Sequence, residues 1–249
     1  MSFELPECYV ISHQLDTVLK NKTIINYKIK NYEKLQKNNA LNKEIKFFDK
    51  LLNNQIVSVE SKSSMILINL KTNHILLIGP EYGGEIQFVK AGEEYTEKYQ
   101  LKITFSDNSY LYILIKGFGY CYLYDHDKLG ENYVYRRDYK KIQANDDENL
   151  TLKILSTKLK EKNKNIKVML VGKEAIISGI ANSLFQEIIF EAGIHPREKS
   201  SDLTDKQIKN LLSAITTIIN NRITQKGKHK VVDIYGQKGG YKPVMDSSF

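Results

Sequence analysis

The chain has 249 residues, of which 41% are apolar and 27% charged, and its formal net charge is +8 at pH 7. A chain of this length can bury a sizeable core in one large or two smaller domains, and we expect two. No apolar run approaches the roughly 18 residues that a membrane helix needs, which argues against a membrane role. The positive charge favours a polyanionic partner such as nucleic acid, although scattered lysines make this a weak signal on its own.

The amino terminus and the cysteines indicate the compartment. Glu4 and Glu7 lie where a targeting signal would carry basic residues, and no apolar run follows them. Two cysteines, Cys8 and Cys121, are too few for a disulfide framework or a four-ligand zinc site, so we expect both to be small core residues. These features predict a cytoplasmic protein in a reducing compartment.

The first half of the chain has the pattern of one helix followed by many strands. Pro6 suits the first turn of a helix, and apolar residues then recur at helical spacing as far as Leu19. Turn residues separate the strand-like runs that follow, and closely spaced strands form antiparallel hairpins. The predicted strands are 56–60, 65–70, 74–78, 100–105, 110–115 and 120–124.

The second half is mainly helical in pattern. Residues 125–149 are polar, lack a strong period and are expected to connect two domains. Helices are predicted over 152–160 and 175–190, and the capping box Thr204-Asp205-Lys206-Gln207 predicts the start of another helix. The last residues, 226–249, contain glycine-rich turns among basic side chains and are expected to be extended on the surface.

One stretch of the helical half resembles a known motif. Ser178-Gly179-Ile180-Ala181-Asn182, followed by the sequence EIIFEAGIHP over 187–196, resembles the helix-two-turns-helix signature of the formamidopyrimidine-DNA glycosylase and endonuclease VIII family. The resemblance implies that Gly179 lets the backbone approach a DNA phosphate and that Asn182 binds it, at a helix N-terminus that favours negative charge. The alternative is that Gly179 is a plain turn residue and Asn182 a helix N-cap.

Both ends of the chain extend the resemblance. Glu4-Leu5-Pro6-Glu7 is similar to the family's opening motif, and residues 232–241 look like the stretch before its carboxy-terminal zinc finger. The four cysteines of that finger are absent, either because the protein lacks the finger or because the chain has been shortened. No other metal or nucleotide motif is visible, so we expect no metal and no nucleotide cofactor in this chain.

The resemblance also implies a base-excision reaction, with altered catalytic groups. Family members use an amino-terminal proline as nucleophile beside a glutamate that donates a proton, whereas here Phe3 precedes Glu4. Removal of Met1 would expose the amine of Ser2, which could form the Schiff base, with Glu4 or Glu7 moving the proton. An α-amine is uncharged at neutral pH far more often than a lysine side chain. The alternative is an inert terminus.

The groups that hold DNA in the family are altered too. Ser64 aligns with a lysine on an active-site strand, and Lys62, two positions earlier, is expected to share its face and to reach a phosphate, unless it is a plain exposed lysine. Lys116 and Phe118 stand where the family has an Arg-x-Phe pair, and Glu81 stands where it has a methionine. Lys116 would hold a phosphate and Phe118 would wedge between bases, unless Phe118 is a core residue.

The sequence therefore predicts an α+β protein. An N-terminal antiparallel β-sandwich with a flanking helix is expected over 1–137, a helix-two-turns-helix domain over 138–226, and an extended tail over 227–249 where the family zinc finger would begin. We expect a monomeric DNA repair protein that binds damaged double-stranded DNA. Two functions remain open: a DNA glycosylase with AP lyase activity, and a catalytically inactive relative that recognises damaged DNA.

Overall fold

Helix α1 (Leu5–Leu19) opens the structure, a computed structural model that describes residues 3–244. Glu7 accepts a hydrogen bond from the N–H of Glu4 at 3.1 Å, which satisfies a donor at the helix start, and Pro6 lies in the first turn, where its missing N–H costs nothing. The predicted first helix is confirmed. Ser2, the predicted nucleophile, lies outside the described residues.

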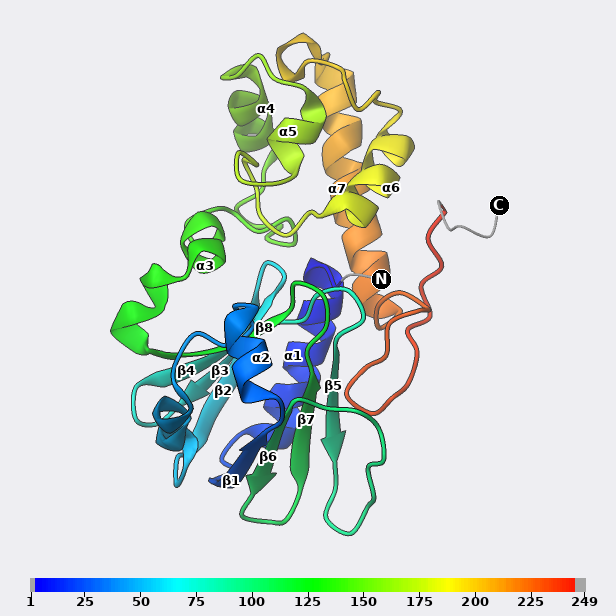
Figure 1. Ribbon diagram of the computed structural model, residues 1–249. Helices are drawn as coiled ribbons and strands as arrows, with labels where there is room; N and C mark the ends of the chain where they lie inside the picture. Colours follow the sequence, from blue (N-terminus) through cyan, green and yellow to red (C-terminus); the bar gives the residue numbers. More distant parts are fainter. Residues whose placement is uncertain (1–2, 245–249) are drawn as a thin grey trace.

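Residues 3–244 contain two antiparallel sheets of four strands, with the orders β1-β6-β7-β5 and β2-β3-β4-β8. Helix α1 lies against the sheets (Figure 1), and side chains of both sheets and of α1 share one hydrophobic core. All six predicted strands are present. The strands are β1 (Ile24–Ile29), β2 (Ile56–Lys62), β3 (Met65–Leu70), β4 (His74–Gly79), β5 (Glu85–Val89), β6 (Leu101–Phe105), β7 (Tyr110–Leu114) and β8 (Tyr120–Asp125).

Two strands escaped prediction, β1 and β5. In β1 only Ile24 is buried, so the strand lacks the alternation of apolar and polar residues that marks a half-buried strand. Its position is decided by pairing with β6, in which Ile29 faces Leu101. Between β1 and β2 the chain forms the short helices α2 (Tyr32–Lys37) and η1 (Ile45–Leu51), which contribute Leu35 and Phe48 to the same core.

The connection after β8 is more ordered than its sequence indicated. It forms the 3-10 helix η2 (His126–Glu131) and the helix α3 (Tyr133–Asp138), whose N-cap Asn132 accepts from the N–H of Tyr135 at 2.8 Å. Leu129 and Tyr124 pack with apolar residues of β3 and β4 in a small separate core. This packing holds α3 beside the waist between the sandwich and the helical lobe (Figure 1).

The helical lobe consists of α4 (Leu152–Lys160), α5 (Ile166–Leu170), α6 (Asn182–Ala192), η3 (Ser200–Asp202) and α7 (Asp205–Thr224). Helix α4 and the capping box at Thr204 are confirmed. The predicted helix over 175–190 is wrong before position 182, because the chain turns there and pairs with the connection through Ala144 N–H to the Ser178 carbonyl at 2.9 Å. No helix of the described residues is long and apolar enough to cross a membrane.

The tail after α7 is not the surface segment that its sequence predicted. Lys228 and Ile234 are buried, Ile234 packs in the core of the sandwich, and Tyr241 packs in the core of the helical lobe. The tail thus passes the waist and contacts both lobes (Figure 1). Its glycines predicted surface turns, yet Gly239 lies so close to Gly227 that a Cβ atom would be 2.2 Å from the Gly227 carbonyl oxygen.

Gly179, in the turn before α6, lies directly against Leu5 of α1. Its φ is +97°, and a Cβ atom there would lie 2.2 Å from Cδ1 of Leu5, which is buried in the core of the helical lobe. An L side chain at this position would therefore be strained by its backbone and blocked by its neighbour. The residue determines how closely the amino terminus approaches the helical lobe.

We expect Gly179→Ala to lower the free energy of unfolding by about 2–4 kcal/mol, the sum of the left-handed backbone and the overpacking against Leu5. Gly193 is a matched control because its φ is +66° and a Cβ atom there would meet nothing within 4 Å. Gly193→Ala should cost only about 1 kcal/mol. Urea denaturation measures the free energy of unfolding of both variants and of the parent. Equal losses of stability in the two variants would contradict the close contact between Gly179 and Leu5.

Candidate nucleic-acid interface

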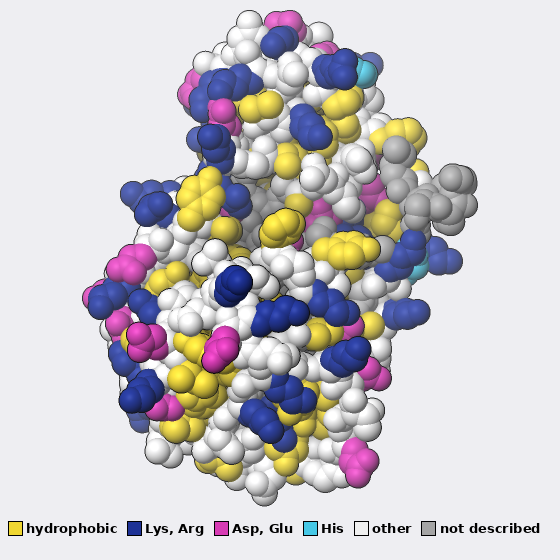
Figure 2. All heavy atoms as spheres, viewed as in Figure 1, with side chains coloured by type: hydrophobic (Ala, Val, Ile, Leu, Met, Phe, Trp, Pro, Cys, Tyr) yellow, Lys and Arg dark blue, Asp and Glu magenta, His cyan; other side chains and the backbone are white. Residues whose placement is uncertain are grey.

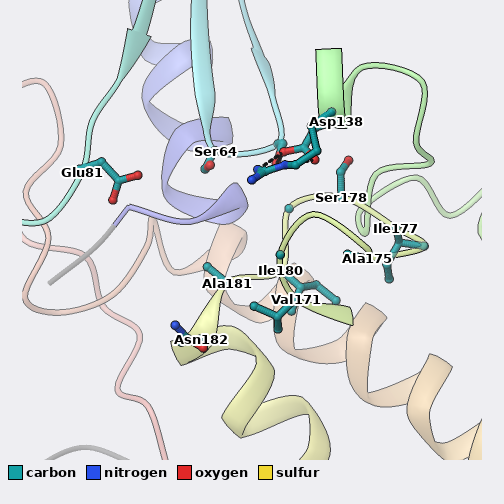
Figure 3. A pocket seen from close by; sticks show the side chains of 14 residues that line it. Ser64, Glu81, Asp138, Val171, Ala175, Ile177, Ser178, Ile180, Ala181 and Asn182 are labelled. Atoms are coloured by element: carbon teal, nitrogen blue, oxygen red, sulfur yellow. Dashed lines mark hydrogen bonds and ion pairs between the residues drawn. The ribbon is translucent and has the colours of Figure 1, made fainter. Parts of the chain in front are cut away.

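The two lobes meet at a pocket of about 200 Å³, called here the waist pocket (Figure 3). The sandwich side contributes Ser64 and Glu81, and α3 contributes Arg137 and Asp138. The turn 177–182, which carries the predicted motif, forms the opposite wall. The structure therefore brings residues from three distant parts of the chain to one space.

The motif turn is open to the waist pocket. Asn182 is the first residue of α6 and lines the pocket, while Ala181 is the N-cap, so the alternative in which Asn182 caps the helix is wrong. Gly179 also lines the pocket. The first N–H groups of an α-helix have no acceptor within the helix, and they carry a partial positive charge. Binding of phosphate by Gly179 and Asn182 remains a prediction, in a location that permits it.

Lys62 and Ser64 do not share a face. Lys62 ends β2 and Met65 begins β3, so Ser63, with a φ of +57°, and Ser64 form the turn between the strands. Ser64 lines the waist pocket, whereas Lys62 lines a separate cavity of about 290 Å³, with its Nζ 5.7 Å from the centre of the Tyr139 ring. The expectation that Lys62 and Ser64 share a strand face is therefore wrong, because the turn interrupts the strand period, and a phosphate contact by Lys62 stays a prediction.

The loop between β7 and β8 presents an exposed aromatic ring. Phe118 is 93% exposed, so its interpretation as a core residue is wrong, and Lys116 beside it is exposed as well. Tyr82, on the adjacent loop, is 69% exposed. Figure 2 shows further hydrophobic and basic side chains near the waist on the face in view. A bare phenyl ring beside an exposed lysine is a combination suited to stacking against a base.

Glu4 and Glu7 lie in a buried ionic cluster rather than on an open surface. Glu4 is 0% exposed; its Oε1 accepts from the N–H of Leu184 at 3.0 Å, and its Oε2 accepts from Arg222 Nη1 at 2.9 Å and from Lys228 Nζ at 3.0 Å. Glu7 accepts from the backbone N–H of Lys228 at 3.2 Å. These contacts join α1 to α6, to α7 and to the tail.

A third carboxylate completes the cluster. Arg222 Nη2 donates to Glu187 Oε2 at 2.5 Å, and Tyr241 donates its hydroxyl to the same oxygen at 3.3 Å. Sequence reasoning missed Arg222 and Glu187. A signal existed, because Arg222 continues the apolar stripe of α7 at helical spacing from Ile215 and Ile219, and a cation at a core position requires buried partners.

The two amino-terminal glutamates differ in their electrostatics. Burial acts to raise the pKa of Glu4, but Lys228, Arg222 and the Leu184 N–H outweigh it, so the pKa lies below its ordinary value of 4.5. For Glu7 burial prevails over the attraction of Lys228 and Arg222, and the pKa is raised. Glu4 is therefore an ionised acceptor at neutral pH, and Glu7 holds a proton more readily than an ordinary glutamate.

Two further groups bear on the chemistry. Phe3, at the position of the family's proline, is 5% exposed and packs in the core of the sandwich. Cys8 and Cys121 are buried as predicted, and burial raises the pKa of both thiols, which disfavours metal-binding thiolates. Among residues 3–244 no group of three or more His, Cys, Asp or Glu could hold a metal ion, so these residues do not fit the family's zinc site.

Comparison with known proteins assigns the chain to a family. The formamidopyrimidine-DNA glycosylase N-terminal domain matches residues 3–121, and the H2TH domain of formamidopyrimidine-DNA glycosylase matches residues 143–233. Formamidopyrimidine-DNA glycosylase of Carboxydothermus hydrogenoformans is 33% identical over 101 residues, 40% of this chain and 38% of that protein. The Bacillus cereus enzyme is 23% identical over 248 residues, 98% of this chain and 86% of that protein. The chain belongs to the formamidopyrimidine-DNA glycosylase and endonuclease VIII family.

Solved structures confirm the predicted fold class. The complex of Lactococcus lactis Fpg with DNA containing an abasic site has a TM-score of 0.79 at 18% identity, and the match covers 95% of this chain and 84% of that chain. MutM in complex with DNA containing carbocyclic 8-oxo-G has a TM-score of 0.79 at 19% identity, with the same shares covered. An antiparallel β-sandwich followed by a helix-two-turns-helix domain is thus the architecture of this protein.

We expect Glu4→Gln to lower the free energy of unfolding by about 3 kcal/mol or more near neutral pH, because Arg222 and Lys228 lose a shared buried carboxylate. A carboxyl whose pKa is lowered by folding stabilises the folded state at pH values above its ordinary pKa. This stabilisation is lost as the pH falls through the pKa that the carboxyl has in the folded protein. The difference between variant and parent should therefore shrink below pH 4.5. Denaturant titrations between pH 7 and acidic pH measure this difference in unfolding free energy, and Glu191→Gln, at an exposed position, is the control. A difference that stays the same at every pH would contradict this account.

Proposed function

We propose that this protein is a base-excision DNA glycosylase with AP lyase activity that binds damaged duplex DNA across the waist between its lobes. The observation that carries the proposal is the match of both domains to one family of DNA glycosylases, with the motif turn 177–182 open to the waist pocket. The relatives are named formamidopyrimidine-DNA glycosylases, and similar solved structures hold DNA with an abasic site or a modified guanine.

The proposed binding surface has three parts. The start of α6 offers to a phosphate the side chain of Asn182 and the helix N–H groups that precede Leu184, whose own N–H is bound to Glu4. Lys116 supplies an exposed cation, and Phe118 supplies an aromatic ring that fills the space left by an extruded nucleotide. Lys62 is a more distant contributor because its cavity is separate from the waist pocket. Such contacts to phosphates release counterions, so affinity should fall steeply with salt.

The proposed reaction uses an α-amine at the start of the chain. The amine of Ser2, exposed by removal of Met1, forms a bond to the sugar C1′ while the bond from C1′ to the base breaks. The base leaves with that electron pair and takes up a proton. Glu7 is the better proton source, because its pKa is raised by burial. The proton that the amine loses passes to solvent, because Glu4 has a lowered pKa and is a weak base.

A second candidate function is recognition of damaged DNA without catalysis. Phe3 occupies the proline position in the hydrophobic core, and Glu4 is fully buried with two cations and one N–H on its carboxylate. These contacts favour a structural role for the opening motif. A monomeric state, a cytoplasmic location and the lack of a metal or nucleotide cofactor remain predictions under both functions.

Borohydride trapping on duplexes that carry an abasic site or an oxidised base separates the two functions. A glycosylase with lyase activity should give a covalent adduct, and mass spectrometry should locate it on Ser2, because reduction fixes the Schiff base. Binding that weakens with salt but yields no adduct on any of these duplexes would support the inactive relative. Absence of salt-sensitive binding to every duplex would overturn both functions.

Phe118→Ala should weaken binding to duplexes with an abasic site on the order of tenfold, because stacking of an aromatic ring on a base is lost. Phe190 is the matched control, since it is 60% exposed on α6 and lines none of the cavities near the waist. Phe190→Ala should bind like the parent. Fluorescence anisotropy at fixed salt measures both, and equal affinity of the Phe118 variant and the parent would exclude the wedge.

A further inference from the structure

Arg137 is the only lysine or arginine, among residues 3–244, that lines the waist pocket. It lies in α3, in the connection whose structure the sequence did not reveal. Lys62 faces another cavity, and Ser64, on the sandwich wall of the waist pocket, has no charge. A phosphate that enters this pocket therefore meets one guanidinium.

Asp138 holds that guanidinium by one edge. Arg137 Nε donates to Asp138 Oδ1 at 2.8 Å, and Nη2 donates to Oδ2 at 2.5 Å. Asp138 is 3% exposed and is itself held by Ser63 Oγ at 3.4 Å and Lys141 Nζ at 3.6 Å. Arg137 Nη1 has no hydrogen-bond partner within the part of the chain that the structure describes. A guanidinium has five N–H donors, so the second edge remains available while the first fixes its orientation.

The opposite wall supplies an independent sign of a missing ligand. Ser178 is 3% exposed, and its Oγ is a buried atom without a hydrogen-bond partner among the described residues. A buried hydroxyl without a partner is unfavourable, so such an atom at a pocket is normally satisfied by a bound group or an ordered water. Figure 3 shows Ser64, Asp138 and Ser178 along one side of the pocket and Asn182 on the other.

The donors around this space suit an oxyanion. Asp138 is paired with two cations, Arg137 in the pocket lining and Lys141 outside it, and the start of α6 lies at the pocket. Glu81 also lines the pocket, but burial raises the pKa of its carboxyl and Arg137 offsets only part of that effect, which weakens its repulsion. A volume of about 200 Å³ accommodates a phosphate group.

We propose that Arg137, aligned by Asp138, binds a backbone phosphate of DNA in the waist pocket together with the hydroxyl of Ser178. The inference rests on the proposed DNA binding, and it names the cation on which that binding depends. Arg137 is a positioning residue: it anchors the strand next to the motif turn and takes no part in bond making. Asp138 prepares the guanidinium before DNA arrives.

The first test compares two adjacent arginines of α3. Arg136 does not line the waist pocket, so Arg136→Ala removes the same charge without touching the site. Arg137→Ala should weaken duplex binding on the order of tenfold, alike for all sequences, and should reduce the slope of log affinity against log salt by about one. Arg136→Ala should stay within about twofold of the parent. Equal effects of the two variants would overturn the proposal.

A second variant guards against a mere folding defect, because Arg137→Ala leaves Asp138 buried without its main partner. The double variant Arg137→Ala with Asp138→Asn removes both charges and should bind DNA as weakly as the single variant. Adding Ser64→Lys to this double variant returns a cation to the same pocket from the sandwich side and should restore most of the affinity. Failure of restoration in a protein that unfolds like the parent would contradict the role of Arg137 as the pocket's cation.

Binding of inorganic phosphate tests this site independently of the proposed DNA binding. Phosphate, compared with chloride at equal ionic strength, should raise the melting temperature of the parent and of Arg136→Ala but not of Arg137→Ala. If the parent binds no duplex, the function proposed above fails, whereas the phosphate shift still reports on the pocket. A shift that depends on Arg137, in a protein whose DNA affinity does not, would show a site for free phosphate and would overturn the DNA contact.

Discussion

The structure depends on a buried cluster of opposite charges at the waist. Arg222 of α7 lies between Glu4 at the start of α1 and Glu187 of α6, and Lys228 of the tail shares Glu4 with it. None of these side chains is more than 2% exposed, so removal of one partner would leave an uncompensated charge in a medium of low dielectric constant. The cluster therefore keeps the two lobes at one distance and orientation, on which the waist pocket and the motif turn depend.

The same cluster limits the chemistry that the opening motif can perform. A carboxylate that accepts three hydrogen bonds, as Glu4 does, is stabilised in its ionised form, so at neutral pH it has no proton to donate and is a weak base. Glu7 is buried beside it and has a raised pKa, so the pKa values of the two carboxyls are shifted in opposite directions. Pairs of this kind are used for acid and base roles in active sites, and they also occur in purely structural clusters. The position of the attacking amine decides between these uses.

Much of the fold was legible in the sequence, and the errors of prediction have definite causes. The six strongest strands and α4 were predicted because their apolar periods report burial along one element. Strand β1 escaped because its pairing, rather than its own side chains, holds it in the sheet. Lys62 was misplaced because the strand period was extended through a turn. The tail was misjudged because Gly239 serves close packing and not exposure.

The sequence by itself determined the family, the order of the β-sandwich and the helical domain, and the turn ending at Asn182, since each is carried by local spacing or by a contiguous motif. Only the tertiary structure decided the partners of the buried charges and the composition of the waist pocket. Ser64, Arg137 and Ser178 reach that pocket from three segments separated by dozens of residues. No local period encodes such a meeting, because it follows from how two hydrophobic cores dock and not from the pattern of either one.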